Sequence, residues 1–269
     1  MIPKKIHYCW FGNPQKPKSV LKCIESWKKF CPDYEIIEWN ESNIDVNINA
    51  YTKEAFDAKV WGFVTDYLRL FIVYNHGGIY LDTDVELIKP LDALLSTPAF
   101  AGFEIGNISS GLFVALGLGF GAEPRNEIVL QHMKIYDNLH FKNEDGTYNK
   151  LPAPHYTTEL LKNHGLNVFD NSIQDLGDIV IYPTEYFCPK GFSSGVSYIT
   201  ADTFSIHHFD ASWLDEETRH DVQKKRKEHK RKVKRNNLRH NITHIPHRIA
   251  RFFLGTTLYE RIKAKFKKE

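Results

Sequence analysis

The stretch TDYLRLFIVYNHGGIYLDTD, residues 65–84, says more about the fold than any other part of the chain. Apolar residues recur at three- and four-residue steps from about Lys53 to His76, which predicts a helix. The pair Gly77-Gly78 ends this helix, and the apolar segment Ile79–Leu87 is predicted to be a strand. A helix that leads through glycines into an apolar strand is typical of an α/β sheet.

The N-terminal residues repeat this alternation of strand and helix. Ile6 to Trp10 predicts a strand that runs into a turn, Ser19 opens a helix that ends before Pro32, and Tyr34–Trp39 predicts a second strand. The order β-α-β favours a parallel pairing. We therefore expect an α/β domain with a mainly parallel central sheet. Further helices are expected around residues 125–165, and late strands at Ile179–Pro183 and Phe204–His208.

Composition excludes several classes of protein. The chain has 269 residues, 42% hydrophobic and 25% charged, which is ordinary for a soluble globular protein. The longest largely apolar run, Gly111–Ala122, is too short to span a bilayer of about 30 Å. No hydrophobic signal segment follows Met1. The cysteines show no CxxC spacing, so we expect reduced thiols in a cytoplasmic protein; they are Cys9, Cys23, Cys31 and Cys188.

The net charge of +2 conceals a sharp division along the chain. Residues 219–269 hold 18 Lys/Arg and 4 Asp/Glu, a net charge of +14, which leaves 17 and 29, a net charge of −12, for the remainder. Such a shift indicates that the two parts have different partners. We predict a domain over residues 1–215 and a basic helical tail over residues 216–269.

Two pairs of charged residues indicate a site for a metal ion and for a hydroxyl- or phosphate-bearing ligand. Asp82 and Asp84, two apart on the predicted strand, would project together, and two carboxylates at the end of a parallel strand can hold Mn²⁺ or Mg²⁺. Such an ion would neutralise a departing diphosphate. Asp66 and Arg69 lie three apart on one helix face and suit hydroxyl and phosphate recognition. The structural alternative for Asp82 and Asp84 is a solvated turn, and the alternative for Asp66 and Arg69 is an ion pair on the surface of a helix.

These residues carry a family resemblance. The order D-x-x-R and then G-G-x-Y-x-D-x-D resembles the sugar-nucleotide glycosyltransferases with a DXD sugar-binding region, most of all family thirty-two, which includes bacterial capsule and lipopolysaccharide enzymes and yeast mannosyltransferases. Clostridial glucosylating toxins are more distant relatives. The opening Ile2–Gly12 and the later segment Ile206–Trp213 are similar to the family's P-K-x-I-H-x-x-W-x-G and I-H-H-x-x-x-S-W blocks.

The resemblance implies a GT-A-like fold and a role for each matching residue. Trp10 would lie against the nucleotide base, with pocket contacts near Asn40. Asp66 and Arg69 would contact the donor sugar and diphosphate, and Arg69 would act in catalysis with the carboxylate pair. The remaining assignments are Tyr80 in the donor pocket, Asp84 and Asp82 on the metal, His207 or His208 as a further metal ligand, and Ser212 and Trp213 over the diphosphate. Because strand neighbours point to opposite faces, we expect only one of the two histidines to be a ligand.

The function expected from these motifs is a metal-dependent, retaining glycosyltransferase. It would move a sugar from a nucleotide donor, a UDP-sugar, to a hydroxyl of a cell-surface glycan or its lipid-linked precursor, as in capsule or lipopolysaccharide synthesis. One alternative is a phosphohydrolase of the haloacid-dehalogenase type, although Glu86 occupies the position where that motif has Thr or Val. The glycines of Gly117–Gly121 do not have the spacing of a dinucleotide-binding loop and predict a tight backbone segment.

The basic tail allows two further interpretations. Residues 219–240 could bind nucleic acid, but they have no interleaved aromatic residues for base stacking. The last segment places apolar residues at helical spacing between basic ones, which suits an anionic membrane surface. We expect no nucleic-acid partner and a peripheral position on the inner face of the cytoplasmic membrane. The apolar set comprises Ile245, Ile249, Phe252, Phe253, Leu258, Ile262 and Phe266.

Overall fold

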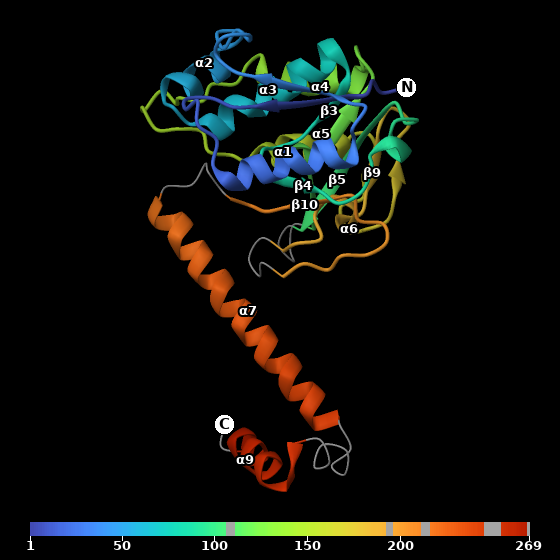
Figure 1. Cartoon of the computed structure of the whole chain (residues 1–269). Helices are drawn as coiled ribbons and strands as arrows, with labels where there is room; N and C mark the ends of the chain where they lie inside the picture. The colour runs from blue at the N-terminus through green and yellow to red at the C-terminus, as the bar shows by residue number, and fades with distance from the viewer. Residues whose placement is uncertain (106–110, 192–195, 211–215, 245–253, 268–269) are drawn as a thin grey trace. The chain divides into compact units, whose positions relative to one another are not determined.

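The computed structural model describes residues 1–105, 111–191, 196–210, 216–244 and 254–267. The chain divides into two compact units, residues 1–192 with 197–215 and residues 193–196 with 216–269. The first unit contains a β-sheet covered by helices, and the second contains the helices α7 (Glu216–His244) and α9 (Thr256–Lys267) (Figure 1). No described helix combines the length and apolarity that a membrane crossing requires.

The first unit is built on a twisted sheet of eight described strands. The strand order is β2-β1-β3-β7-β5-β9-β8, and β6 pairs with β5 outside this path. From the pairings, β2, β1, β3, β5 and β9 run in one direction and β6, β7 and β8 in the other. The predicted α/β class with a mainly parallel sheet is therefore confirmed. The strands are β1 (Lys5–Cys9), β2 (Glu35–Trp39), β3 (Gly78–Tyr80), β5 (Ala99–Ile105), β6 (Leu112–Ala115), β7 (Phe120–Ala122), β8 (Gln174–Asp175) and β9 (Val180–Tyr182).

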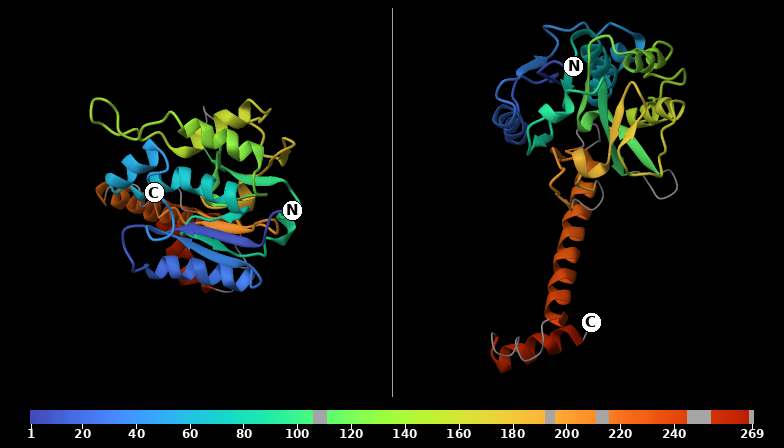
Figure 2. Two further views of the ribbon diagram at one scale, coloured as in Figure 1. Left: turned by 90° about the horizontal axis from the view of Figure 1, so that it is seen from above. Right: turned by 90° about the vertical axis from the view of Figure 1, so that its right-hand side faces the viewer.

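Helices cover both faces of this sheet, with α1 on the opposite side from α4 and α5 (Figure 2, left). On one face, α2 (Ala50–Asp57), α3 (Trp61–His76), α4 (Glu127–Tyr136) and α5 (Ala153–Lys162) enclose one apolar core. On the other face, α1 (Lys18–Phe30) and α6 (Thr184–Phe187) enclose a second core. A small ribbon of β4 (Val85–Leu87) and β10 (Ser205–His207) belongs to this side. The 3₁₀ turns are η1 (Asp92–Leu94) and η2 (Leu116–Leu118).

Several predicted elements match the structure closely. Helix α1 buries Val20, Ile24 and Trp27, which recur at helical spacing, and the indole nitrogen of Trp27 donates to the carbonyl of Val85 at 2.8 Å. Helix α3 ends at its C-cap Gly77, where φ is +61°. A Cβ at this position would lie 2.7 Å from the ring of Pro124, so both conformation and space favour glycine.

Two predicted elements are wrong in their extent. The single helix predicted from Lys53 to His76 is two helices, because the chain takes a positive φ of 60° at Lys59 between α2 and α3. The single strand predicted over Ile79–Leu87 is β3 and β4 with a turn between them. Asp82 and Asp84 lie in this turn, so the strand alternation used to place them together does not apply.

Three strands that were not predicted from the sequence lie between residues 99 and 122. This segment supplies β5, β6 and β7 to the centre of the sheet, and β5 pairs with three neighbours. β6 and β7 have only four and three residues, and β5 begins with a continuous apolar run, so the alternation that marks a strand is weak in all three. Glycines in this segment allow close packing: a Cβ on Gly102 would lie 2.5 Å from the ring of Phe187.

Candidate active site

The turn between β3 and β4 carries the two predicted metal ligands. Its backbone is tied to two other elements: the amide of Leu81 donates to His7 in β1 at 3.0 Å, and the amide of Asp82 donates to Gly117 in η2 at 3.1 Å. The turn is closed by the amide of Val85, which donates to the carbonyl of Asp82 at 3.0 Å. The turn therefore sits at the carboxyl edge of the parallel strands, where ligands of α/β sheets collect.

Asp84 is paired with His207 from the distant strand β10. The Nε2 atom of His207 lies 3.0 Å from a carboxylate oxygen of Asp84, and the other oxygen accepts the amide of Asp210 at 2.8 Å. Burial opposes ionisation of Asp84, but His207 and the amide outweigh it and lower its pKa to about 2. Burial likewise disfavours a charged His207, yet Asp84 raises its pKa. The pairing favours an ionised Asp84.

Asp82, Asp84 and His207 form a candidate metal-binding cluster. One ligand atom from each of the three lies within 4.8 Å of the others, and all three side chains are half-buried. Two carboxylates and an imidazole are a donor set that suits a divalent cation such as Mn²⁺. The Nδ1 atom of His207 is buried and has no hydrogen-bond partner among the residues that the structure describes. Both the donor set and this free nitrogen fit a bound ion.

His208 is not part of this cluster, so of the two histidines that the sequence left open it is His207 that lies beside Asp82 and Asp84. The ring nitrogen Nε2 of His208 lies 2.8 Å from Glu86, which is also 3.0 Å from Lys22. Its carbonyl accepts from Lys190 at 2.6 Å. His207 ends β10 and contacts Asp84, whereas His208 follows the strand and contacts Glu86, so the two rings have different partners.

Asp66 and Arg69 form a buried pair beside Asp82. The guanidinium of Arg69 lies 3.2 Å from Asp66 and 3.5 Å from Asp82. It also donates to the carbonyl and hydroxyl of Thr65 at 3.0 and 3.1 Å. Burial raises the pKa of Asp66 to about 7, against the attraction of Arg69. The pair is therefore an interior feature of α3 and not a helix-surface ion pair.

The ring of Tyr80 packs against the guanidinium of Arg69. This ring is 1% exposed, and the guanidinium carbon of Arg69 lies 5.2 Å from the ring centroid. The side chain is thus covered, and it touches the site through Arg69. Its predicted contact with a donor remains a prediction.

Trp10 and Asn40 directly follow the neighbouring strands β1 and β2, and both are linked to Glu38, a carboxylate that was not predicted as a site residue. Glu38 accepts from Tyr8 at 2.5 Å and from Asn40 at 3.3 Å, and it lies 2.7 Å from Lys16. The ammonium of Lys16 also lies 5.7 Å from the ring centroid of Trp10. Because β1, β2 and β3 are parallel neighbours, this cluster and the β3–β4 turn share one edge of the sheet.

Another missed residue is Glu104, near the carboxyl end of β5. It is half-buried, and burial raises its pKa to about 6, with smaller influences from His207 and Asp82. The available signal was a single acidic residue within the otherwise apolar run AFAGFEI. The predicted residues Ser212 and Trp213 lie outside the described part of the chain.

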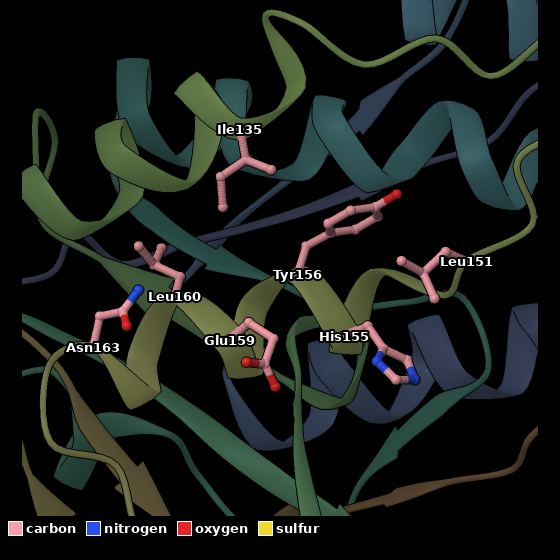
Figure 3. A pocket seen from close by; sticks show the side chains of 7 residues that line it. All are labelled: Ile135, Leu151, His155, Tyr156, Glu159, Leu160 and Asn163. Carbon is pink, nitrogen blue, oxygen red and sulfur yellow. The ribbon is translucent and has the colours of Figure 1, made fainter.

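An open pocket of about 370 Å³ lies beside α4 and α5, and none of the predicted site residues lines it (Figure 3). Ile135 faces it from α4, and the other lining residues belong to α5 or its two ends. They are Leu151, His155, Tyr156, Glu159, Leu160 and Asn163.

Comparisons with known proteins find partial similarities to glycosyltransferases. Inositol phosphoceramide mannosyltransferase 3 of Schizosaccharomyces pombe is 34% identical over 103 residues, which cover 37% of this chain and 29% of that protein. A glycosyltransferase of Acanthamoeba polyphaga mimivirus, described as uncharacterised, is 23% identical over 228 residues, 79% of this chain and 84% of that protein. The structure of PaToxG glycosyltransferase gives a TM-score of 0.46 at 20% identity, covering 60% of this chain and 69% of that one.

The match to a family covers about a third of the chain. This chain spans less than a third of the length of the fission-yeast relative. Residues 17–101 match the family described as a glycosyltransferase sugar-binding region containing a DXD motif. This segment includes Asp66, Arg69, Asp82 and Asp84, so four of the predicted site residues lie in the part of the chain that is similar to that family.

Proposed function

We propose that this chain is a metal-dependent, retaining glycosyltransferase that transfers a sugar from a nucleotide-sugar donor, a UDP-sugar, to a hydroxyl group. The observation that carries this proposal is the convergence of Asp82 and Asp84 with His207, a residue more than 120 positions away, beside the buried Arg69. Membership of family thirty-two and retention of anomeric configuration rest on the sequence resemblance.

Each residue of the site has a task in this reaction. Asp82, Asp84 and His207 would hold Mn²⁺ or Mg²⁺, which neutralises charge on a leaving diphosphate when bound. Arg69 is fixed by Thr65 and Asp66 before any ligand arrives. A preorganised guanidinium stabilises developing negative charge without reorganisation, which is often the largest contribution to catalysis. Trp10 offers a flat, half-buried face for the nucleotide base.

The acceptor proposal comes from the relatives and from the tail. The name of the fission-yeast relative describes a mannosyltransferase for a phosphoinositol-containing lipid, and we extend this to a glycan or lipid-linked glycan acceptor at a membrane. The basic tail would hold the enzyme at an anionic surface on the cytoplasmic side. In the described part of α9, Leu258 is 50% exposed among the exposed basic residues Arg261 and Lys265. The apolar residues Ile245, Ile249, Phe252 and Phe253 lie outside the described residues.

The test is thermal unfolding with UDP, GDP, CMP or buffer, each with and without Mn²⁺. A ligand at a hundred times its dissociation constant stabilises the folded state by about 2.7 kcal/mol. We expect one nucleotide to stabilise the wild type only when metal is present, and to leave Asp84→Ala unchanged. The matched control is Glu86→Gln, because Glu86 contacts His208 and Lys22 and not the cluster.

A failure of every nucleotide would overturn the donor assignment. Release of phosphate from a small ester in Mg²⁺, with no dependence on nucleotide sugars, would instead support the phosphohydrolase alternative. A nucleotide that stabilises both the wild type and Asp84→Ala would show that nucleotide binding does not depend on the carboxylate cluster.

A further inference from the structure

The glycine-rich segment Gly117–Gly121, which the sequence left without a function, contacts the candidate site. Its first residue lies in η2, directly after β6, and its carbonyl accepts the amide of Asp82 at 3.1 Å. The backbone of η2 therefore forms a wall of the turn that carries the metal ligands.

The space around Gly117 is already filled by the side chain of Asp82. A Cβ at position 117 would lie 2.0 Å from Oδ2 and 2.8 Å from Cγ of Asp82, and 3.1 Å from Nη1 of Arg69. A real Cβ does not approach another heavy atom closer than 3.0 Å. The carboxylate thus occupies the volume that any other residue at this position would need.

Backbone conformation does not require glycine here. Gly117 is absent from the glycines with positive φ, whereas its neighbour Gly119 has a φ of 148°. The φ angle of position 117 is therefore open to L-residues, so the requirement for glycine comes from space, chiefly from the contact with Asp82 and secondarily from Arg69.

We propose that Gly117 is a positioning residue for Asp82: its bare Cα allows the carboxylate to lie between Arg69 and the Asp84–His207 pair. The inference rests on the proposed metal and diphosphate site. Without this space, the carboxylate would have to move by about 1 Å, the difference between 2.0 and 3.0 Å. Metal–ligand distances hold within about 0.2 Å, so such a displacement removes a ligand from its place.

The predicted signature of Gly117→Ala is a loss of binding with little loss of stability. The clashing atoms belong to the end of a half-buried side chain, which can rotate away. We expect the variant to fold, with a small decrease in Tm, and to bind Mn²⁺ about tenfold or more weakly, the effect typical of losing a contact that orients a ligand.

Gly121→Ala is the matched control because it reverses this signature. A Cβ at Gly121 would lie 2.5 Å from the ring of Phe100, which is fully buried and cannot rotate away, and Gly121 also has no positive φ. We expect it to lower Tm more than Gly117→Ala does while leaving the affinity for Mn²⁺ unchanged. If this control does not fold, Gly102→Ala against Phe187 replaces it.

The experiment measures Mn²⁺ affinity by electron paramagnetic resonance, and Tm, on the full chain. The variants are Gly117→Ala, Asp82→Ala and the double variant. If Gly117 acts through Asp82, adding Gly117→Ala to Asp82→Ala weakens Mn²⁺ binding no further, and the loss of Tm caused by Gly117→Ala disappears. Wild-type affinity in Gly117→Ala, or an equal loss in both backgrounds, would overturn the proposal.

The Tm cycle separates this proposal from the proposed function. If the wild type binds no Mn²⁺, the metal site fails, but the coupling between positions 117 and 82 is still measured by thermal unfolding without metal. A coupling of zero in that cycle would refute the positioning role by itself.

Discussion

The carboxylate site and the basic tail are both dense in charge, yet they accommodate it in opposite ways. In the site, the side chains of Arg69, Asp84 and His207 are 8%, 15% and 14% exposed, and each contacts an oppositely charged or hydrogen-bonding partner. In α7, most of the charged side chains that the structure describes are exposed. Buried charge requires partners at fixed positions, whereas exposed charge is stabilised by water. Substitutions should therefore have large, position-specific effects in the site and small, salt-dependent effects in the tail.

The largest effect is expected for Asp84→Asn. This variant keeps an oxygen for the amide of Asp210 but removes the negative charge next to His207. We expect sugar transfer to fall by about a hundredfold or more, because even partners behind a metal ligand change affinity by 10- to 100-fold. Initial rates with saturating donor and Mn²⁺ measure this. Transfer at the wild-type rate would remove Asp84 from the site.

A comparison of His207→Ala with His208→Ala tests the site at the level of neighbouring residues. Only His207 belongs to the metal cluster, and His208 contacts Glu86. We expect the first variant to weaken Mn²⁺ binding by about tenfold or more and the second to leave it nearly unchanged. Isothermal titration with Mn²⁺ gives both affinities. Equal losses would contradict the separation of the two rings.

The tail should respond to apolar substitution in the way a membrane-binding surface does. Leu258→Asp removes a side chain that is 50% exposed, and Ile173→Asp is its control in the first unit, where Ile173 is 52% exposed. Burial of a leucine in lipid contributes about 1.5–3 kcal/mol, so we expect at least about tenfold weaker binding for Leu258→Asp alone. Sedimentation with vesicles of phosphatidylcholine and phosphatidylglycerol measures this. Equal binding by both variants would argue against a membrane role for α9.

A buried histidine outside the site should give the fold a dependence on pH. His7 donates from Nε2 to Gly77 at 2.8 Å, and its Nδ1 accepts from Trp39 at 3.2 Å, so the neutral ring satisfies both contacts. Burial lowers the pKa of His7 to about 4. Since the unfolded chain binds this proton near pH 6.5, stability present above pH 6.5 is lost as the pH falls towards 4.

The loss from His7 amounts to about 3 kcal/mol. Urea unfolding of the wild type and His7→Asn at pH 7, 5 and 4 isolates this contribution, because His132, whose pKa burial lowers to about 3, acts in the same direction in both proteins. A pH dependence that is the same in the two proteins would show that His7 does not titrate as described.

The smallest effect is expected for Tyr136→Phe in α4. The hydroxyl of Tyr136 is buried and has no hydrogen-bond partner in the described chain. A buried hydroxyl without a partner is unfavourable, so its removal should be neutral or raise the stability by about 1 kcal/mol. Urea unfolding measures the change. A clear loss of stability would indicate that the hydroxyl bonds to an ordered water.

Much of this protein could be predicted from its sequence. The β-α-β start, the glycine stop of α3 and the charge division are local patterns, and local patterns follow from residue spacing and composition. The pairing of Asp82 with Asp84 was predicted correctly, although for a reason that does not hold, because the two lie in a turn and not on a strand. The strands β5, β6 and β7 were missed because β6 and β7 have only four and three residues and β5 begins with a continuous apolar run, so none of them shows a clear alternation.

The α/β class and the identity of the charged residues follow from the amino-acid sequence, and its motifs predict the enzyme class. The folded structure was needed to show which of the two adjacent histidines reaches Asp84. It was also needed to show that Glu38 contacts both Lys16 and Asn40, and that Gly117 leaves space for Asp82. The difference follows from how far apart in the chain the interacting residues are. Helical spacing and charge content act between neighbours in the chain, whereas the site joins residues from β3, β10 and η2, whose distances are fixed only when the sheet has formed.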